Sequence, residues 1–92
     1  MIKNFAHKGL EKFFNTGNKA GIRPDHANKL QRQLAMLNVA KEPQEMGFPG
    51  WRLHQLSGRM SGHWSIWVSG NWRLTFCFIG EDADIVDYQD YH

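Results

Sequence analysis

Side chains able to move protons or hold a phosphate occur at three places in the second half of the sequence. His54 stands in a short apolar run, Arg73 lies inside an aromatic run, and Asp90-Tyr91-His92 are the last three residues. Imidazole titrates near neutral pH, guanidinium offers a charged fork to phosphoryl oxygens, and a tyrosine ring can stack on a base. These types fit metal-independent RNA cleavage, which needs a base at the 2′-hydroxyl, an acid at the 5′-oxygen and a cation at the phosphate.

Each of these residues also has a structural explanation when it is taken alone. A strand arginine is commonly solvated or paired with a carboxylate, and a single strand histidine is usually structural. The chemical interpretation therefore depends on whether His54, Arg73 and the C-terminal residues meet in the folded chain.

Metal and nucleotide chemistry have less support. The potential ligands have no close metal-binding spacing, and the glycines match no phosphate-binding loop. We therefore predict no metal and no cofactor. The residues considered are His7, His26, His54, His63, His92 and Cys77 as ligands, and Gly47, Gly50 and Gly58 as loop glycines.

Charge and cysteine content indicate the compartment and the partner. Residues 1–80 hold eleven basic side chains against four acids, a net +7, while residues 81–92 hold five acids and no base. A basic body favours a polyanion such as RNA, although an ordinary solvated surface explains the charge equally simply. Cys77 has no disulfide partner, the opening residues lack a signal peptide's apolar stretch, and no window could span a membrane. We expect a soluble, cytoplasmic protein.

The first half of the chain has helical spacing. Residues 1–5 are a possible edge strand, and apolar residues recur at helical intervals from His7 to about Asn15. A second helix is predicted from about Ile22 to Val39, with Pro24 in its first turn. Its apolar stripe is Ala27, Leu30, Leu34 and Leu37, and we expect Lys29, Arg32 and Gln33 to face elsewhere.

After a loop over residues 41–50, the period changes to two. Strands are predicted over residues 51–56, 64–69, 72–79 and 83–88, with turns at Gly70-Asn71 and Gly80-Glu81-Asp82. The predicted fold is one α+β domain over residues 1–92, of order β-α-α-β-β-β-β. Two helices cover one face of a mainly antiparallel sheet and leave the other face at least partly open.

The C-terminal residues extend the last predicted strand. By period two, Tyr88, Asp90 and His92 share a face, and we expect this face to bring acid–base groups to the edge of the open sheet. Tyr91 would then point the other way.

Nearly the whole chain resembles the HigB toxins, a branch of the RelE-like toxins of bacterial toxin–antitoxin systems. The similarity rests on several segments together and not on one tripeptide. They are Met1-Ile2-Lys3-Asn4-Phe5, Lys8-Gly9-Leu10, Arg52-Leu53-His54-Gln55-Leu56-Ser57-Gly58, Gly62-His63-Trp64-Ser65-Ile66-Trp67-Val68, Asn71-Trp72-Arg73-Leu74-Thr75-Phe76 and Asp90-Tyr91-His92.

The resemblance implies a ribosome-dependent endoribonuclease that cuts mRNA in the ribosomal A site and is held inactive by a HigA-like helix-turn-helix antitoxin. It gives catalytic or substrate-positioning roles to His54, Arg73, Asp90, Tyr91 and His92. We expect Arg73 to stabilise the phosphate, and His54 and His92 to transfer protons or support that transfer. Asp90 is a candidate base or an orienter of the imidazole, and Tyr91 is expected to position the nucleotide. Because the resemblance wants Tyr91 in the site too, we predict that the last residues leave strand geometry and curl over the open face.

One position departs from the family pattern. Where many HigB relatives have a lysine after the His54 strand, this chain has Ser57, and Arg59 follows two residues later. We hypothesise that Arg59 supplies the missing charge, and we place Arg52, Ser57 and Arg59 at the RNA-binding surface.

Two other functions remain open. ParE-like toxins resemble the same fold but inhibit DNA gyrase, and such an inhibitor would not need the polar set around Arg73. A purely structural RNA-binding module would use aromatic rings to stack bases, but Trp72, Phe76 and Phe78 share the strand face expected to be buried.

Overall fold

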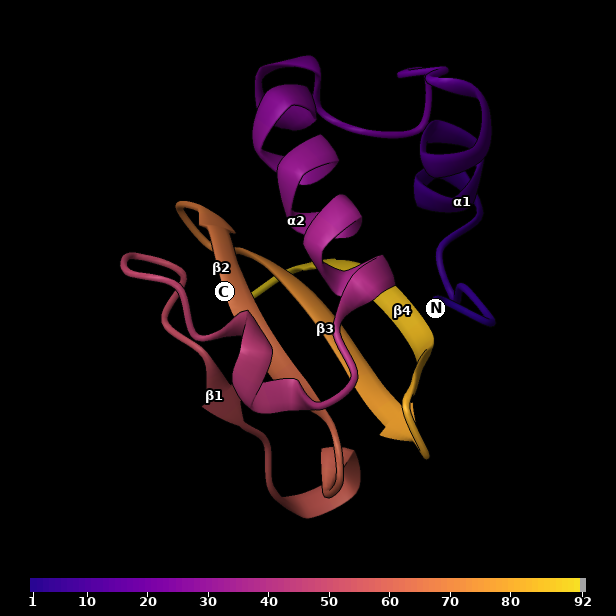
Figure 1. The fold of residues 1–92 in the computed structure, drawn as a ribbon. Coiled ribbons are helices and arrows are strands. Elements are labelled where there is room, and N and C mark those ends of the chain that lie inside the picture. The colour runs from indigo at the N-terminus through magenta and orange to yellow at the C-terminus, as the bar shows by residue number, and fades with distance from the viewer. Residues whose placement is uncertain (92) are drawn as a thin grey trace.

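The computed structural model describes residues 1–91 and contains two α-helices and a four-stranded antiparallel sheet, as predicted. The helices lie together on one side of the sheet (Figure 1). The elements are α1 (Lys8–Thr16), α2 (Ala27–Val39), β1 (His54–Gln55), β2 (Trp64–Ser69), β3 (Trp72–Ile79) and β4 (Asp82–Asp90), with short 3₁₀ turns at Pro24–His26, Pro43–Met46 and Gly58–Met60. In the part of the chain that these coordinates describe, no helix is long and apolar enough to cross a bilayer.

Helix α1 is bounded by two residues with distinct roles. The His7 ring accepts a hydrogen bond from the Leu10 amide at the N-terminus, and Gly17 adopts a left-handed φ of 81° after the last turn. Leu10 and Phe13 are buried against the sheet. The predicted helix over residues 7–15 is thus confirmed within one residue at each end.

Helix α2 begins later than predicted because Pro24 starts a 3₁₀ turn that leads into it at Ala27. The predicted stripe is confirmed, since its four residues are all buried. Gln33, however, is fully buried, and the expectation that it faces away from the core is wrong. Its side-chain amide donates to the Trp67 carbonyl at 3.0 Å, so a strand edge accounts for a polar residue in the interior.

The sheet has the order β1-β2-β3-β4, and every neighbouring pair is antiparallel. Strands β2 and β3 begin and end where the period-two pattern predicts. Ile66, Leu74, Phe76 and Val86 are buried in one core with the apolar residues of the helices. We call the sheet face that carries these residues the covered face, and the opposite one, which carries Arg73, the open face.

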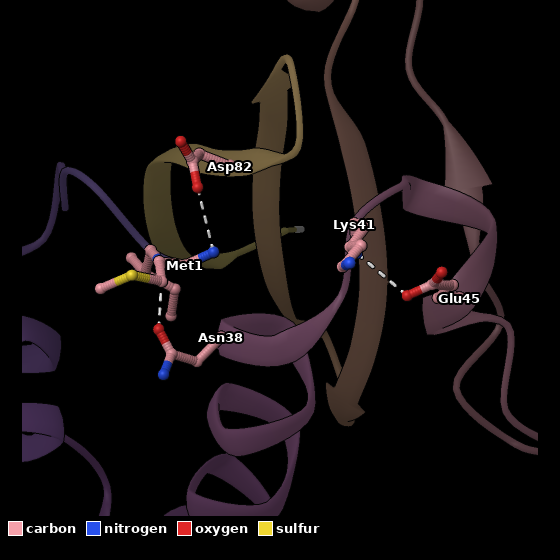
Figure 2. A network of polar contacts seen from close by, with 6 residues as sticks. Met1, Asn38, Lys41, Glu45 and Asp82 are labelled. Carbon is pink, nitrogen blue, oxygen red and sulfur yellow. Dashed lines mark hydrogen bonds and ion pairs between the residues drawn. The ribbon is translucent and has the colours of Figure 1, made fainter.

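The predicted edge strand at the N-terminus forms only two isolated parallel bridges to β4, Ile2 with Ala83 and Phe5 with Val86. Figure 2 shows how this segment is fastened: the Met1 amino group lies 3.2 Å from the Asp82 carboxylate. The Ile2 amide donates to the Asn38 side chain at 3.0 Å. The opening residues thereby join β4 to the C-terminal end of α2.

Strand β1 is much shorter than the predicted strand over residues 51–56. Arg52 has a φ of 52°, a left-handed conformation that interrupts the ladder. The backbone still pairs with β2 on both sides of this break, since the Trp67 amide donates to Trp51 and the Leu56 amide donates to His63.

Strand β4 contains a bulge that sets the orientation of its last residues. The register with β3 shifts between Thr75 and Cys77, and Ile85 has a φ of 50°. Beyond the bulge, Tyr88 lies opposite Leu74 and Asp90 opposite Trp72. Partners in an antiparallel pair share a face, so Tyr88 and Asp90 do share a face as predicted, but it is the covered face. The expectation that they reach the open face is wrong.

Candidate active-site cleft

A cleft of about 570 Å³ opens on the side of the sheet that carries Arg73. Three elements meet there: the segment around β1, the middle of β2 and β3, and the residue after β4. Its lining residues are Arg52, Leu53, His54, Leu56, Ser65, Arg73 and Tyr91. Four residues predicted from the sequence to act on RNA, Arg52, His54, Arg73 and Tyr91, are therefore brought together.

The sheet register positions the two central groups of the cleft. His54 lies opposite Ser65 on β2, while Arg73 lies opposite Trp67 two residues further along β2. His54 is exposed, and Ser65, at 4% exposure, lies between the flanking strands as the floor of the cleft. Since neighbouring strands lie about 4.8 Å apart, β1 and β3 are separated by roughly 10 Å. A nucleotide can fit between such side chains.

Arg73 is held from behind by the turn that precedes it. Its Nη1 donates to the carbonyls of Gly70 at 3.1 Å and Trp72 at 3.2 Å. Within residues 1–91, its Nε and Nη2 have no hydrogen-bond partner. The guanidinium is therefore fixed on one side and has donors left for an anion.

Tyr91 reaches the cleft without leaving the direction of the strand. Its backbone amide donates to the Asn71 carbonyl at 2.7 Å, which continues the pairing of β4 with the β2–β3 turn. Because Asp90 is on the covered face, ordinary alternation turns Tyr91 to the open face. As far as Tyr91, the predicted curl of the C-terminal residues is not needed. His92 lies outside the described residues.

Asp90 lies away from this cleft. It lines a separate hollow of about 310 Å³ with Arg23, Asp25, His26 and Trp72. The structure therefore does not bring the Asp90 carboxylate together with His54 and Arg73.

A buried polar pair lies beside Asp90. His26 Nδ1 and the Tyr88 hydroxyl are 2.6 Å apart, and both side chains are at most 5% exposed. Burial lowers the pKa of His26, with Asp25 opposing this effect and Arg23 and Lys29 adding to it. Burial also raises the pKa of Tyr88. Near neutral pH both groups are therefore uncharged, and the pair is part of the core.

The two remaining residues predicted at the RNA-binding surface follow β1. Ser57 precedes the 3₁₀ turn Gly58–Met60, and Arg59 lies within that turn. Both are exposed, and neither is among the residues that line the cleft. The charge closest to His54 in the lining comes instead from Arg52.

Sequence reasoning missed three polar or aromatic residues of the open face. Ser65 and Trp67 alternate with buried Ile66, so their face was readable from period two. Asp87 pairs with Thr75 on the open face only because of the bulge. Its carboxylate accepts hydrogen bonds from the Tyr88 amide at 2.8 Å and from the Gln89 side chain at 3.1 Å.

The cleft combines an imidazole, two guanidinium groups and a phenol. This set can bind a phosphate, exchange a proton and contact a base. Among residues 1–91, no three His, Cys, Asp or Glu side chains gather in a way that could hold a metal ion.

Comparison with known proteins gives the same family as the sequence motifs. Residues 3–92 match the family model described as the RelE-like toxin of the type II toxin–antitoxin system HigB. The chain is 41% identical over 92 residues to "Endoribonuclease HigB" of Proteus vulgaris, and the match covers all of both chains. It is 30% identical over 94 residues to "Toxin HigB-1" of Vibrio cholerae, with all of this chain and 98% of the relative covered. The predicted resemblance is confirmed: the chain belongs to the HigB-like family of RelE-like toxins from type II toxin–antitoxin systems.

Proposed function

We propose that the protein is an endoribonuclease that cuts mRNA in the ribosomal A site and thereby inhibits translation. One observation carries the proposal: Arg52, His54, Arg73 and Tyr91 line a single open cleft although they come from separate segments. The full-length relative named "Endoribonuclease HigB" supports the same activity. The open cleft and its two guanidinium groups suit an extended polyanion.

Arg73 is the phosphate-stabilising residue in this mechanism. As the 2′-oxygen attacks, the phosphorus becomes five-coordinate and its non-bridging oxygens gain negative charge. A guanidinium already fixed by two carbonyl groups needs little reorganisation to meet that charge, and such preorganised donors lower a barrier strongly.

His54 and His92 exchange the protons. One imidazole takes the proton from the 2′-hydroxyl, and the other returns a proton to the departing 5′-oxygen, which leaves a 2′,3′-cyclic phosphate and a free 5′-hydroxyl. The assignment of base and acid between them stays open. Tyr91, 37% exposed at the cleft, contacts the nucleotide on one side of the scissile bond.

Asp90 acts as a positioning residue. Its carboxylate lies on the opposite face from Arg73, one residue before Tyr91 and two before His92. It holds the end of β4 in place, and the two residues that follow act on the RNA.

Ribosome dependence follows from the openness of the cleft. His54 is exposed and the cleft has no enclosing wall of its own, so a second body must hold the RNA in line for attack. A toxin that acts on translating ribosomes works in the cytoplasm. Its partner is a HigA-like helix-turn-helix antitoxin.

The test is primer extension on mRNA engaged with purified ribosomes, with and without the protein. We expect cuts that appear only when ribosomes are present and that carry 5′-hydroxyl ends. Equal cutting of free RNA would contradict ribosome dependence. Absence of cleavage together with inhibition of DNA supercoiling would replace the nuclease with a gyrase inhibitor.

A further inference from the structure

Trp67 lies next to the cleft and has two cations on its indole ring. Lys29 Nζ, from α2, lies 4.3 Å from the ring centroid, and Arg52 Cζ, from the segment before β1, lies 4.5 Å from it. The indole N–H donates to the Gly70 carbonyl at 2.8 Å. The ring is thus fixed to the β2–β3 turn and holds one cation from each of two distant segments.

These cations lie close together and are not neutralised nearby. Both distances start from one centroid, so the two charges are less than about 9 Å apart, roughly one Debye length at physiological salt. Burial lowers the pKa of Lys29, and Arg52 and Arg32 lower it further by repulsion. No ion pair between residues 1–91 involves Lys29, Arg32 or Arg52. We call these three residues and Trp67 the Trp67 cluster.

The Trp67 cluster continues the basic surface of the cleft. Arg52 belongs to both, since it lines the cleft with Arg73 and also contacts the Trp67 ring. Trp67 is also the cross-strand partner of Arg73 on the open face. Positive charge therefore runs from Arg73 past Arg52 to the start of α2, which lies near the end of β2 (Figure 1).

The chemistry of the Trp67 cluster selects phosphate over a nucleobase. The indole already packs against two cations, so what the cluster presents to solvent is positive charge. Repulsion among three like charges is relieved when an anion binds between them. A polynucleotide backbone supplies such anions at regular intervals along a strand.

We propose that Lys29, Arg32 and Arg52, arranged around Trp67, form a phosphate-binding subsite for the RNA strand where it leaves the cleft. The proposal rests on the nuclease function proposed above and adds the path of the substrate. It also offers a source for the charge that other HigB toxins take from a lysine where this chain has Ser57. In this arrangement Arg52 and Lys29 supply that charge, and exposed Arg59 does not. Trp67 is a positioning residue that holds the two cations.

Binding of non-cleavable RNA tests the subsite without relying on cleavage. The probes are 2′-O-methyl oligonucleotides of three and of ten nucleotides, titrated at several salt concentrations without ribosomes. We expect Lys29→Gln to weaken binding of the ten-nucleotide probe about tenfold, as for loss of one charge-assisted contact. The slope of log K against log salt should fall by about 0.7. The three-nucleotide probe, which fills only the cleft, should bind as it does to the unchanged protein.

Two further variants separate position from charge. Trp67→Phe keeps an aromatic ring and should retain most of the affinity, whereas Trp67→Leu should weaken the longer probe as much as Lys29→Gln does. Lys12→Gln, an exposed lysine of α1, is the matched charge control and should leave both probes unaffected. Thermal unfolding of each variant checks that the fold is intact.

The outcomes distinguish the subsite from the nuclease. Equal affinity of Lys29→Gln and the unchanged protein for the longer probe would overturn the subsite even if ribosome-bound mRNA is cut. Weakening of ribosome binding alone, with normal affinity for the free probe, would also overturn it, because the contact would then be with ribosomal RNA. Absence of cleavage by the unchanged protein would refute the nuclease function instead.

Discussion

Arg73 shows how a single side chain gains a function from its immediate surroundings. An arginine in a strand is ordinary, but this one has Nη1 bound to two carbonyls, and its other nitrogens face a cleft lined by His54 and Tyr91. A point charge on a flexible stem could not be fixed in this way. The residue is therefore suited to meet charge that develops at one defined place.

Replacing Arg73 should reduce cleavage more than binding. We expect Arg73→Ala to lower the rate of ribosome-bound mRNA cleavage at least 100-fold, as for loss of a preorganised charge-stabilising donor. Arg73→Lys should restore only a small part, because an ammonium cannot hold both carbonyls and the phosphate. Primer extension time courses measure the rate, with Lys12→Gln as control. A rate within threefold of the unchanged protein would contradict the role of Arg73.

Tyr91 and Asp90 are neighbours in sequence but face opposite sides of the sheet, so their variants should differ. Tyr91→Phe keeps the ring at the cleft and should cleave within about threefold of the unchanged protein, whereas Tyr91→Ala should lose tenfold or more through lost base stacking. Loss of activity in Tyr91→Phe as severe as in Tyr91→Ala would instead assign a proton to the hydroxyl. Single-turnover cleavage on ribosomes gives these rates.

At the scale of elements, local patterns predicted the strands well and their faces less well. Strands β2 and β3 were predictable because alternation and turn residues agree there. The face of Asp90 was not, because the bulge at Ile85 is a property of the β3–β4 register that no local pattern reveals. Burial of Gln33 depends likewise on a distant strand carbonyl. The cleft residues could be named from the sequence, but their grouping required the register.

The contact of α1 with the loop before α2 depends on two glycines. A Cβ on Gly21 would lie 2.5 Å from the Gly9 Cα, and a Cβ on Gly9 would lie 2.7 Å from the Gly21 carbonyl oxygen. Gly21→Ala should therefore destabilise the protein by about 2 kcal/mol, since backbone must move to make room. Gly17→Asn is the control, because its φ of 81° meets open space and suits asparagine. Urea unfolding measures both, and equal stabilities would contradict the close approach.

The 3₁₀ turn before α2 makes stability depend on pH through His26. Its pKa is lowered mainly by burial, so the unfolded chain binds the proton first as pH falls. Stability should be full above the unfolded pKa of about 6.5 and should fall below it by up to about 1.4 kcal/mol per pH unit, until the folded pKa is reached. The charged groups around the ring are Asp25, Arg23 and Lys29.

Urea unfolding at pH 7.5 and pH 5.5 tests this dependence. We expect His26→Gln to be less stable at pH 7.5, because the contact with Tyr88 is lost, but to change less between the two pH values than the unchanged protein. His54→Gln, at an exposed position, should keep the original dependence. Identical pH dependence in His26→Gln and the unchanged protein would assign the effect to other groups.

For the whole molecule, the direction of the sheet separates the two signs of charge. The end of β3 at Trp72 carries Arg73 and lies near Arg52, whereas the end at Ile79 leads into Glu81, Asp82 and Asp84. Eight residues of strand place these ends about 23 Å apart. The small net charge of +2 thus conceals a polar molecule.

This separation predicts how salt changes the rate at which RNA associates. The Debye length is about 8 Å at 0.15 M salt and about 30 Å at 0.01 M, so the acidic end is screened from the cleft in the first case and not in the second. Substituting Glu81→Gln together with Asp84→Asn should speed association with a fluorescent 2′-O-methyl oligonucleotide at 0.01 M salt and leave it within about twofold at 0.15 M. Lys29→Gln, beside the cleft, should slow association at both. Stopped-flow mixing measures these rates. The same acceleration by the acidic-end variant at both salt concentrations would mean that net charge, and not its placement, governs the approach of RNA.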